Sequence, residues 1–108
     1  MSAAKPPQNE SPFACNVGAF SPAQRERWEE LWARWRAGVQ ERRELSDGYA
    51  LRLTADAGVV MAAAEWMILD RLCCPFFTYM LEIEREGGPL WLRLTGRPGV
   101  KEFMRDHM

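Results

Sequence analysis

A short turn between two segments of strand length, the second of which alternates apolar with other residues, is the feature that most restricts how this chain can fold. Residues 46–48 (Ser-Asp-Gly) separate segment 39–45 from segment 49–53, and an Asp-Gly pair in this position is a strong signal for a β-hairpin. Residues 77–94 repeat the arrangement around a Gly-Gly-Pro turn. Apolar side chains at every second position indicate strands with one buried face. The sequence therefore predicts two antiparallel hairpins.

Segments with helical periodicity precede, separate and follow the two hairpins. A helix over 21–37 begins with Ser-Pro, an N-cap followed by proline in the first turn. A second helix over 56–74 ends before Pro75 and is apolar on nearly all sides. A short helix over 99–107 follows the second hairpin. This order, α-β-β-α-β-β-α, predicts an α+β fold with a four-stranded antiparallel sheet from two hairpins and helices on one face.

Length and charge limit the domain organisation and the partners. The 108 residues indicate one domain, which we place over 13–108, after a polar, Pro-rich tail over 1–12 that we expect to be disordered. The net charge is −1 and no basic cluster is present, so the footprint of a nucleic-acid-binding protein is missing. The longest apolar stretch, 59–69, is too short and too mixed to cross a bilayer. We expect neither nucleic acid nor membrane as a partner.

The helix over 56–74 instead suggests a second copy of the chain as partner. A helix that is apolar nearly all round is either enclosed in a core or covered by another subunit. Met80 and Trp91 add apolar side chains to the sheet face that the helices leave open. We therefore expect a homodimer.

Three cysteines are the residues best suited to chemistry: Cys15 stands alone, whereas Cys73 and Cys74 are adjacent. An odd number, an adjacent pair and the lack of an apolar signal sequence disfavour a secreted disulfide framework. We therefore expect a reducing, cytoplasmic environment in which the thiols stay free.

The spacing around the cysteine pair predicts a metal site. Asp70, Cys73 and Cys74 stand at helical positions i, i+3 and i+4, which share one face. Adjacent residues of a regular helix point about 100° apart, so both thiols reach one ion only if the helix frays before Pro75. Cys15 would have to arrive from the N-terminal segment. Three thiolates suit Hg(II), As(III) or Cu(I), and the lack of paired histidines or a C-x₂-C spacing disfavours zinc.

Two other interpretations of these residues stay open. Free cysteines are among the most buried residues, and the C-terminal end of a helix disfavours a thiolate, so the three thiols could be inert core residues of a structural or interaction module. Alternatively, a thiol attacks or ligates while Asp70 moves a proton, as cleavage of a carbon–metal bond would need. Whether the protein is an enzyme is left undecided. We expect Glu65 to form an ion pair or to lie at a solvent-exposed edge of its helix. His107, the one histidine, lies too near the chain end to support a catalytic triad.

The motif around the cysteine pair also resembles that of a known group. Residues 13–104 resemble a family of small, uncharacterised bacterial proteins. The resemblance rests on the early cysteine, on residues 70–77 (Asp-Arg-Leu-Cys-Cys-Pro-Phe-Phe) and on residues 90–96 (Leu-Trp-Leu-Arg-Leu-Thr-Gly). Its members share an early cysteine, an acidic residue three positions before a Cys-Cys pair and two aromatic residues after it. Some are associated with MerR-type regulators and metal-resistance genes, which implies a thiol-dependent role with soft metals or metalloids. The matching positions here are Cys15, Asp70, Cys73 and Cys74.

Overall fold

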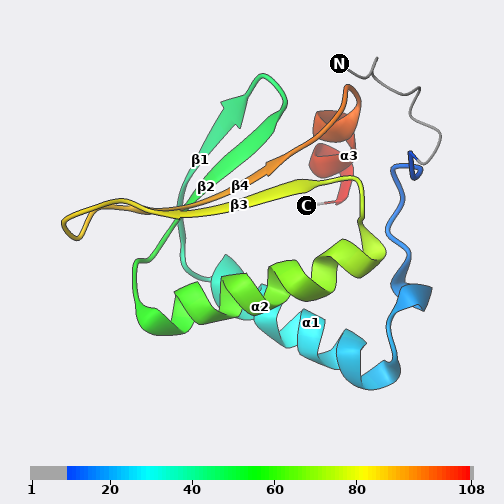
Figure 1. Cartoon of the computed structure of the whole chain (residues 1–108), viewed down its shortest axis with the longest axis horizontal. Helices are drawn as coiled ribbons and strands as arrows, with labels where there is room; N and C mark the ends of the chain where they lie inside the picture. Colours follow the sequence, from blue (N-terminus) through cyan, green and yellow to red (C-terminus); the bar gives the residue numbers. More distant parts are fainter. Residues whose placement is uncertain (1–9, 108) are drawn as a thin grey trace, which may run out of the picture.

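The computed structural model describes residues 10–107 and has the predicted α+β architecture (Figure 1). The predicted tail over 1–12 lies largely outside the described residues. The elements follow one another as a 3-10 turn η1 (Val17–Ala19), α1 (Pro22–Arg36), β1 (Val39–Leu45), β2 (Gly48–Leu53), α2 (Ala57–Cys73), β3 (Thr78–Ile83), β4 (Leu90–Thr95) and α3 (Val100–His107).

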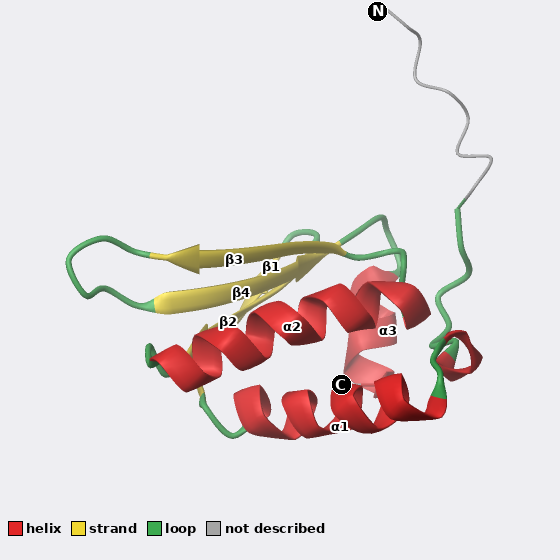
Figure 2. Ribbon diagram, turned by 60° about the horizontal axis from the view of Figure 1, so that its bottom comes forward, coloured by secondary structure: helices red, strands yellow, loops and turns green. Residues whose placement is uncertain are grey.

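The four strands form one antiparallel sheet in the order β1-β2-β4-β3, so the two predicted hairpins join through β2 and β4. In this register Tyr49 pairs with Leu94 and Leu53 with Leu90, and all four side chains are buried. Figure 2 shows the helices on one side of the sheet, with α1 lying along α2. The prediction of a four-stranded antiparallel sheet with helices on one face is confirmed.

Local signals in the sequence explain where α1 begins. The Ser21 hydroxyl accepts a hydrogen bond from the Gln24 N–H at 3.2 Å, and the Gln24 side chain accepts one from the Ser21 N–H at 2.9 Å. This reciprocal pair is a capping box, which satisfies two backbone donors that the first helical turn leaves free. The buried side of α1 is formed by Trp28, Leu31 and Trp35.

Helix α2 has two apolar sides, and only one of them is buried. Asp56 caps its start by accepting a hydrogen bond from the Val59 N–H at 3.0 Å. The buried side carries Trp66, whose ring meets that of Trp35 edge to face at 4.9 Å. The opposite side leaves three large apolar residues exposed, namely Met61, Ile68 and Leu72. Among residues 10–107, no helix combines the length and apolar character that a bilayer-spanning segment requires.

The sheet face without helices is covered by its own side chains. Trp91 is only 5% exposed there, because the guanidinium groups of Arg43 and Arg93 lie over its ring at 4.6 and 5.9 Å from the centroid. Such cation–π stacking removes the indole from water while the charges stay hydrated. Met80 remains half exposed on this face.

Candidate metal centre

The three cysteine sulfurs form a triangle of nearly equal sides. The Sγ of Cys15 lies 3.6 Å from that of Cys73 and 3.4 Å from that of Cys74, and the last two are 3.5 Å apart. All three cysteines are free thiols. Two chain segments separated by 58 residues thus bring three soft ligand atoms to one point, as the sequence-based hypothesis required.

The end of α2 explains how adjacent cysteines share a site. Cys73 is the last helical residue, whereas Cys74 has φ −129° and ψ 66°, well outside helical values. Its N–H still donates to the Asp70 carbonyl at 2.8 Å, so the backbone turns away only after the last helical hydrogen bond. Pro75 favours this break, because proline disfavours a helical conformation in the residue before it. The condition for both thiols to reach one point, a departure from the helix before Pro75, is therefore met.

Several contacts hold the N-terminal segment so that Cys15 reaches the pair. The Asn16 N–H donates a hydrogen bond to the Cys73 carbonyl at 3.0 Å. The Phe13 ring meets that of Phe76 edge to face at 5.2 Å, and the Arg97 guanidinium lies 4.0 Å from the centroid of the Phe13 ring. Arg97 also pairs with Glu10 at 3.0 Å. The segment is therefore anchored on both sides of Cys15.

Gly99 makes room for this anchoring. A Cβ atom at residue 99 would lie 2.7 Å from the Phe13 ring, and its φ of +105° is a backbone conformation that residues with a side chain rarely adopt. The 95–99 segment (Thr-Gly-Arg-Pro-Gly) thus serves two purposes: it starts α3 and it receives the segment that carries Cys15.

Behind the sulfurs, the carboxyl group of Asp70 connects three elements. Asp70 is 3% exposed. It accepts a hydrogen bond from the Trp28 indole N–H of α1 at 2.9 Å and one from the Tyr79 hydroxyl of β3 at 2.5 Å. The Cys73 Sγ lies 3.7 Å from the same oxygen that Trp28 contacts. Both carboxyl oxygens are therefore satisfied within the protein, as a buried polar group requires.

Burial controls the protonation of this cluster. It raises the pKa of Asp70, an effect that the Tyr79 and Trp28 hydrogen bonds partly offset. Burial likewise raises the pKa of Cys15 to about 11. The hydrogen bond between the paired thiols lowers the pKa of Cys73 and raises that of Cys74. A thiol hydrogen bond from Cys74 thus favours the thiolate form of Cys73.

A cavity of about 130 Å³ opens next to the sulfurs. Its walls are mainly aromatic, and two of the three thiols and the Asp70 carboxyl face it. Because Cys15 is exposed, the cluster is not sealed and a small molecule can reach it. The lining residues are Cys15, Trp28, Trp32, Trp66, Asp70, Cys74, Phe77, Phe103 and His107.

The structure also shows partners that the sequence did not indicate. Trp28 lies in a row of tryptophans along one helical face, a pattern typical of core residues, and Tyr79 lies in a strand with ordinary alternation. Neither pattern predicts a contact with Asp70. His107 stacks on Phe103 with 4.3 Å between ring centroids and lines the thiol cavity. Glu65 forms an exposed ion pair with Arg27 of α1 at 2.7 Å, in agreement with the ion-pair interpretation, and takes no part in the cluster.

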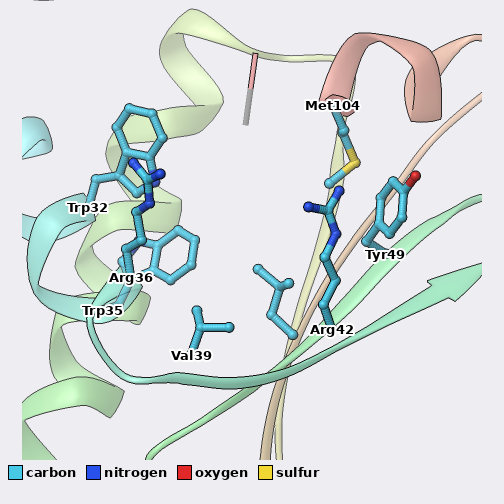
Figure 3. Close-up of a pocket in the computed structure, with 8 residues that line it drawn as sticks. Trp32, Trp35, Arg36, Val39, Arg42, Tyr49 and Met104 are labelled. Carbon is cyan, nitrogen blue, oxygen red and sulfur yellow. The ribbon is translucent and has the colours of Figure 1, made fainter. Parts of the chain in front are cut away.

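A second and larger cavity, of about 260 Å³, lies between the end of α1, the β1-β2 hairpin and α3. Figure 3 shows Arg36 and Arg42 on opposite sides of it, beside Trp32 and Tyr49 respectively. It shares only Trp32 with the lining of the thiol cavity, and no cysteine lines it. Three of the four predicted site residues, Cys15, Asp70 and Cys74, therefore line the smaller cavity.

Comparison with models of protein families, with curated proteins and with solved structures finds no match for this chain. The function has to be inferred from the chemistry of the site itself.

The raised pKa of Asp70 predicts a specific pH dependence of stability. In the unfolded chain the carboxyl titrates near pH ~3.9, and in the folded protein it titrates higher. The native state therefore binds the extra proton, and stability is lost as the pH rises through the folded pKa. The free energy of unfolding, measured with urea at several pH values between 4 and 7, should fall with rising pH in the parent protein and should fall less in Asp70→Asn.

The matched control is Glu65→Gln on the same helix. In the parent protein, the hydrogen bond from Arg27 lowers the pKa of Glu65. The contribution of this ion pair to stability is therefore lost as the pH falls through that lowered pKa, and not as the pH rises. Over the same pH series Glu65→Gln should follow the parent protein. Equal pH profiles for the parent and Asp70→Asn would contradict the assignment of the titrating group.

Proposed function

We propose that this protein binds a soft metal or metalloid ion through Cys15, Cys73 and Cys74. The observation that carries the proposal is the sulfur triangle, whose sides are 3.4–3.6 Å. Two sulfurs bound to one ion at about 2.3 Å can be at most about 4.6 Å apart, and all three pairs lie within this limit. Packing alone does not require three thiols from distant segments to meet at one solvent-accessible point.

The composition of the site favours soft ions. Thiolates select soft ions, whereas carboxylate and carbonyl ligands suit hard cations. A structural zinc site uses four protein ligands, and the group of possible ligand atoms in residues 10–107 consists of the three sulfurs alone. The proposed ligands are therefore three cysteines in a low-coordinate site.

We assign Asp70 a supporting part. Its two oxygens already accept hydrogen bonds from Trp28 and Tyr79, and binding an ion or taking a substrate proton would compete with these contacts. The carboxyl instead holds Cys73 in place, as outer-shell partners of metal ligands do. This occupation of Asp70 favours binding or sensing over turnover.

Three free thiols in contact call for a reducing environment, since they would otherwise oxidise, and we propose a cytoplasmic location. We also propose membership of the bacterial family that the motif resembles. In support, the four motif residues lie together in the fold: Cys15, Asp70, Cys73 and Cys74.

Mercury titration tests the binding proposal. One equivalent of Hg(II) added to the reduced protein should protect at least two of the three thiols from alkylation by iodoacetamide, as counted by intact mass. Cys73→Ser should weaken this protection, because it removes the ligand that Asp70 holds and leaves only Cys15 and Cys74. Circular dichroism checks that the variant keeps its fold. Glu65→Gln, an exposed acid of the same helix, serves as the unaffected control.

The alternative of inert core cysteines makes the opposite prediction. If the thiols are alkylated at the same rate with and without Hg(II), the proposed site is wrong. If Cys15 is alkylated freely in the presence of arsenite as well as Hg(II), while Cys73 and Cys74 are protected, the site is a vicinal pair and not a three-thiol centre.

We further propose a homodimer formed through the exposed side of α2. Met61, Ile68 and Leu72 are 69%, 64% and 41% exposed, and covering them with the same side of a second copy would remove apolar surface from water. Light scattering at micromolar concentration should give twice the mass of 12.4 kDa, and Ile68→Glu should give the monomer mass. A parent protein that already runs as a monomer would rule this interface out.

A further inference from the structure

We infer that the sulfur triangle is shaped for a trivalent metalloid with a lone pair, arsenic(III) or antimony(III), and not for planar or linear Hg(II). This inference rests on the proposed function, because it specifies which soft ion the same three thiols select. It follows from the size of the triangle, from the charge of the product and from the surroundings of the sulfurs.

The size of the triangle fixes the bond angles at a bound ion. With bonds of about 2.3 Å, sulfurs 3.4–3.6 Å apart subtend angles of about 95–103° at the ion. The same bonds would need sulfurs about 3.8 Å apart for tetrahedral angles, about 4.0 Å for a planar three-coordinate ion and about 4.6 Å for a linear one. All three observed distances are shorter than these values.

A pyramidal ion satisfies this geometry without moving the sulfurs. Three-coordinate arsenic(III) and antimony(III) carry a lone pair, which compresses the three bond angles below the tetrahedral value. With bonds of about 2.3 Å, the ion would sit about 1.1 Å above the plane of the sulfurs. Hg(II), which has no such lone pair, would have to spread the triangle or leave one thiol unbound.

The charge of the product points to the same ion. Arsenous acid reacts with three thiols by exchange: three As–S bonds form and three As–O bonds break. Each hydroxide leaves with one thiol proton as water. No oxidation state changes, and the product is neutral. Three thiolates on Hg(II), in contrast, carry one net negative charge.

The surroundings of the sulfurs suit a neutral product. The described residues that line the thiol cavity include neither lysine nor arginine. Their only carboxyl group belongs to Asp70, which lies directly behind Cys73. An extra negative charge would therefore be placed among aromatic rings without a lysine or arginine partner, which is unfavourable. A neutral complex carries no such penalty.

The cavity accounts for the entry of the reactant. Arsenous acid is small and uncharged, and the space of about 130 Å³ beside Cys15 and Cys74 can admit it and release water. Trp28 and Trp32 form part of this wall, so occupation of the site should also change indole fluorescence.

X-ray absorption spectroscopy of the full-length, reduced protein tests the inference, with sodium arsenite and mercuric chloride as separate probes. Arsenite should bind with one equivalent and show three sulfur neighbours. Hg(II) should show two. Replacing Cys15, Cys73 or Cys74 singly by serine should weaken arsenite binding by at least about 100-fold, because even an outer-shell partner of a ligand contributes about 10–100-fold.

Each outcome decides something different. Three sulfurs around Hg(II), with arsenite bound by two or not at all, would overturn the inference and leave the proposed soft-ion site standing. Failure of both ions to bind would remove the proposed function itself. Because Cys73 is buried, Cys73→Ala provides a second variant, and the exposed Cys15→Ser variant keeps the test valid if both changes at residue 73 impair folding.

Discussion

The buried carboxyl group of Asp70 is the interaction on which the rest of the site depends. A carboxyl removed from water is costly unless it is hydrogen-bonded, and Asp70 meets this requirement by joining α1, β3 and the end of α2. Trp28 and Tyr79 donate to it, and Cys73 lies beside it. The position of the Cys73 thiol is therefore coupled to the packing of both long helices against the sheet.

The second requirement is that a distant segment returns to the end of α2. The chain achieves this with Phe13, which contacts both Phe76 and the Arg97 guanidinium, and with the hydrogen bond from Asn16 to Cys73. These anchors lie on both sides of Cys15. The thiol that completes the triangle is thus also the exposed one, through which an ion would enter.

Much of the fold follows from local signals, whereas the environment of the site does not. The Asp-Gly turn, the Ser21 cap and the break at Pro75 act over a few residues, and each appears where the sequence predicts it. The grouping of Asp70 with the cysteine pair was also predictable from helical spacing. The contacts of Trp28 and Tyr79 with Asp70 depend on how three elements pack, and the Glu65 partner, Arg27, comes from another helix. Such contacts leave no periodic pattern in the sequence.

The central claim is that Cys15 belongs to the same cluster as Cys73 and Cys74. Mild oxidation of the ion-free protein with diamide, followed by peptide mapping, tests it most directly, because a disulfide forms readily only between sulfurs that already lie close together. We expect a disulfide that links Cys15 to Cys73 or Cys74 within one chain, since the sulfurs are 3.4–3.6 Å apart. Oxidation that leaves Cys15 as a free thiol, or links it only to a second chain, would contradict it.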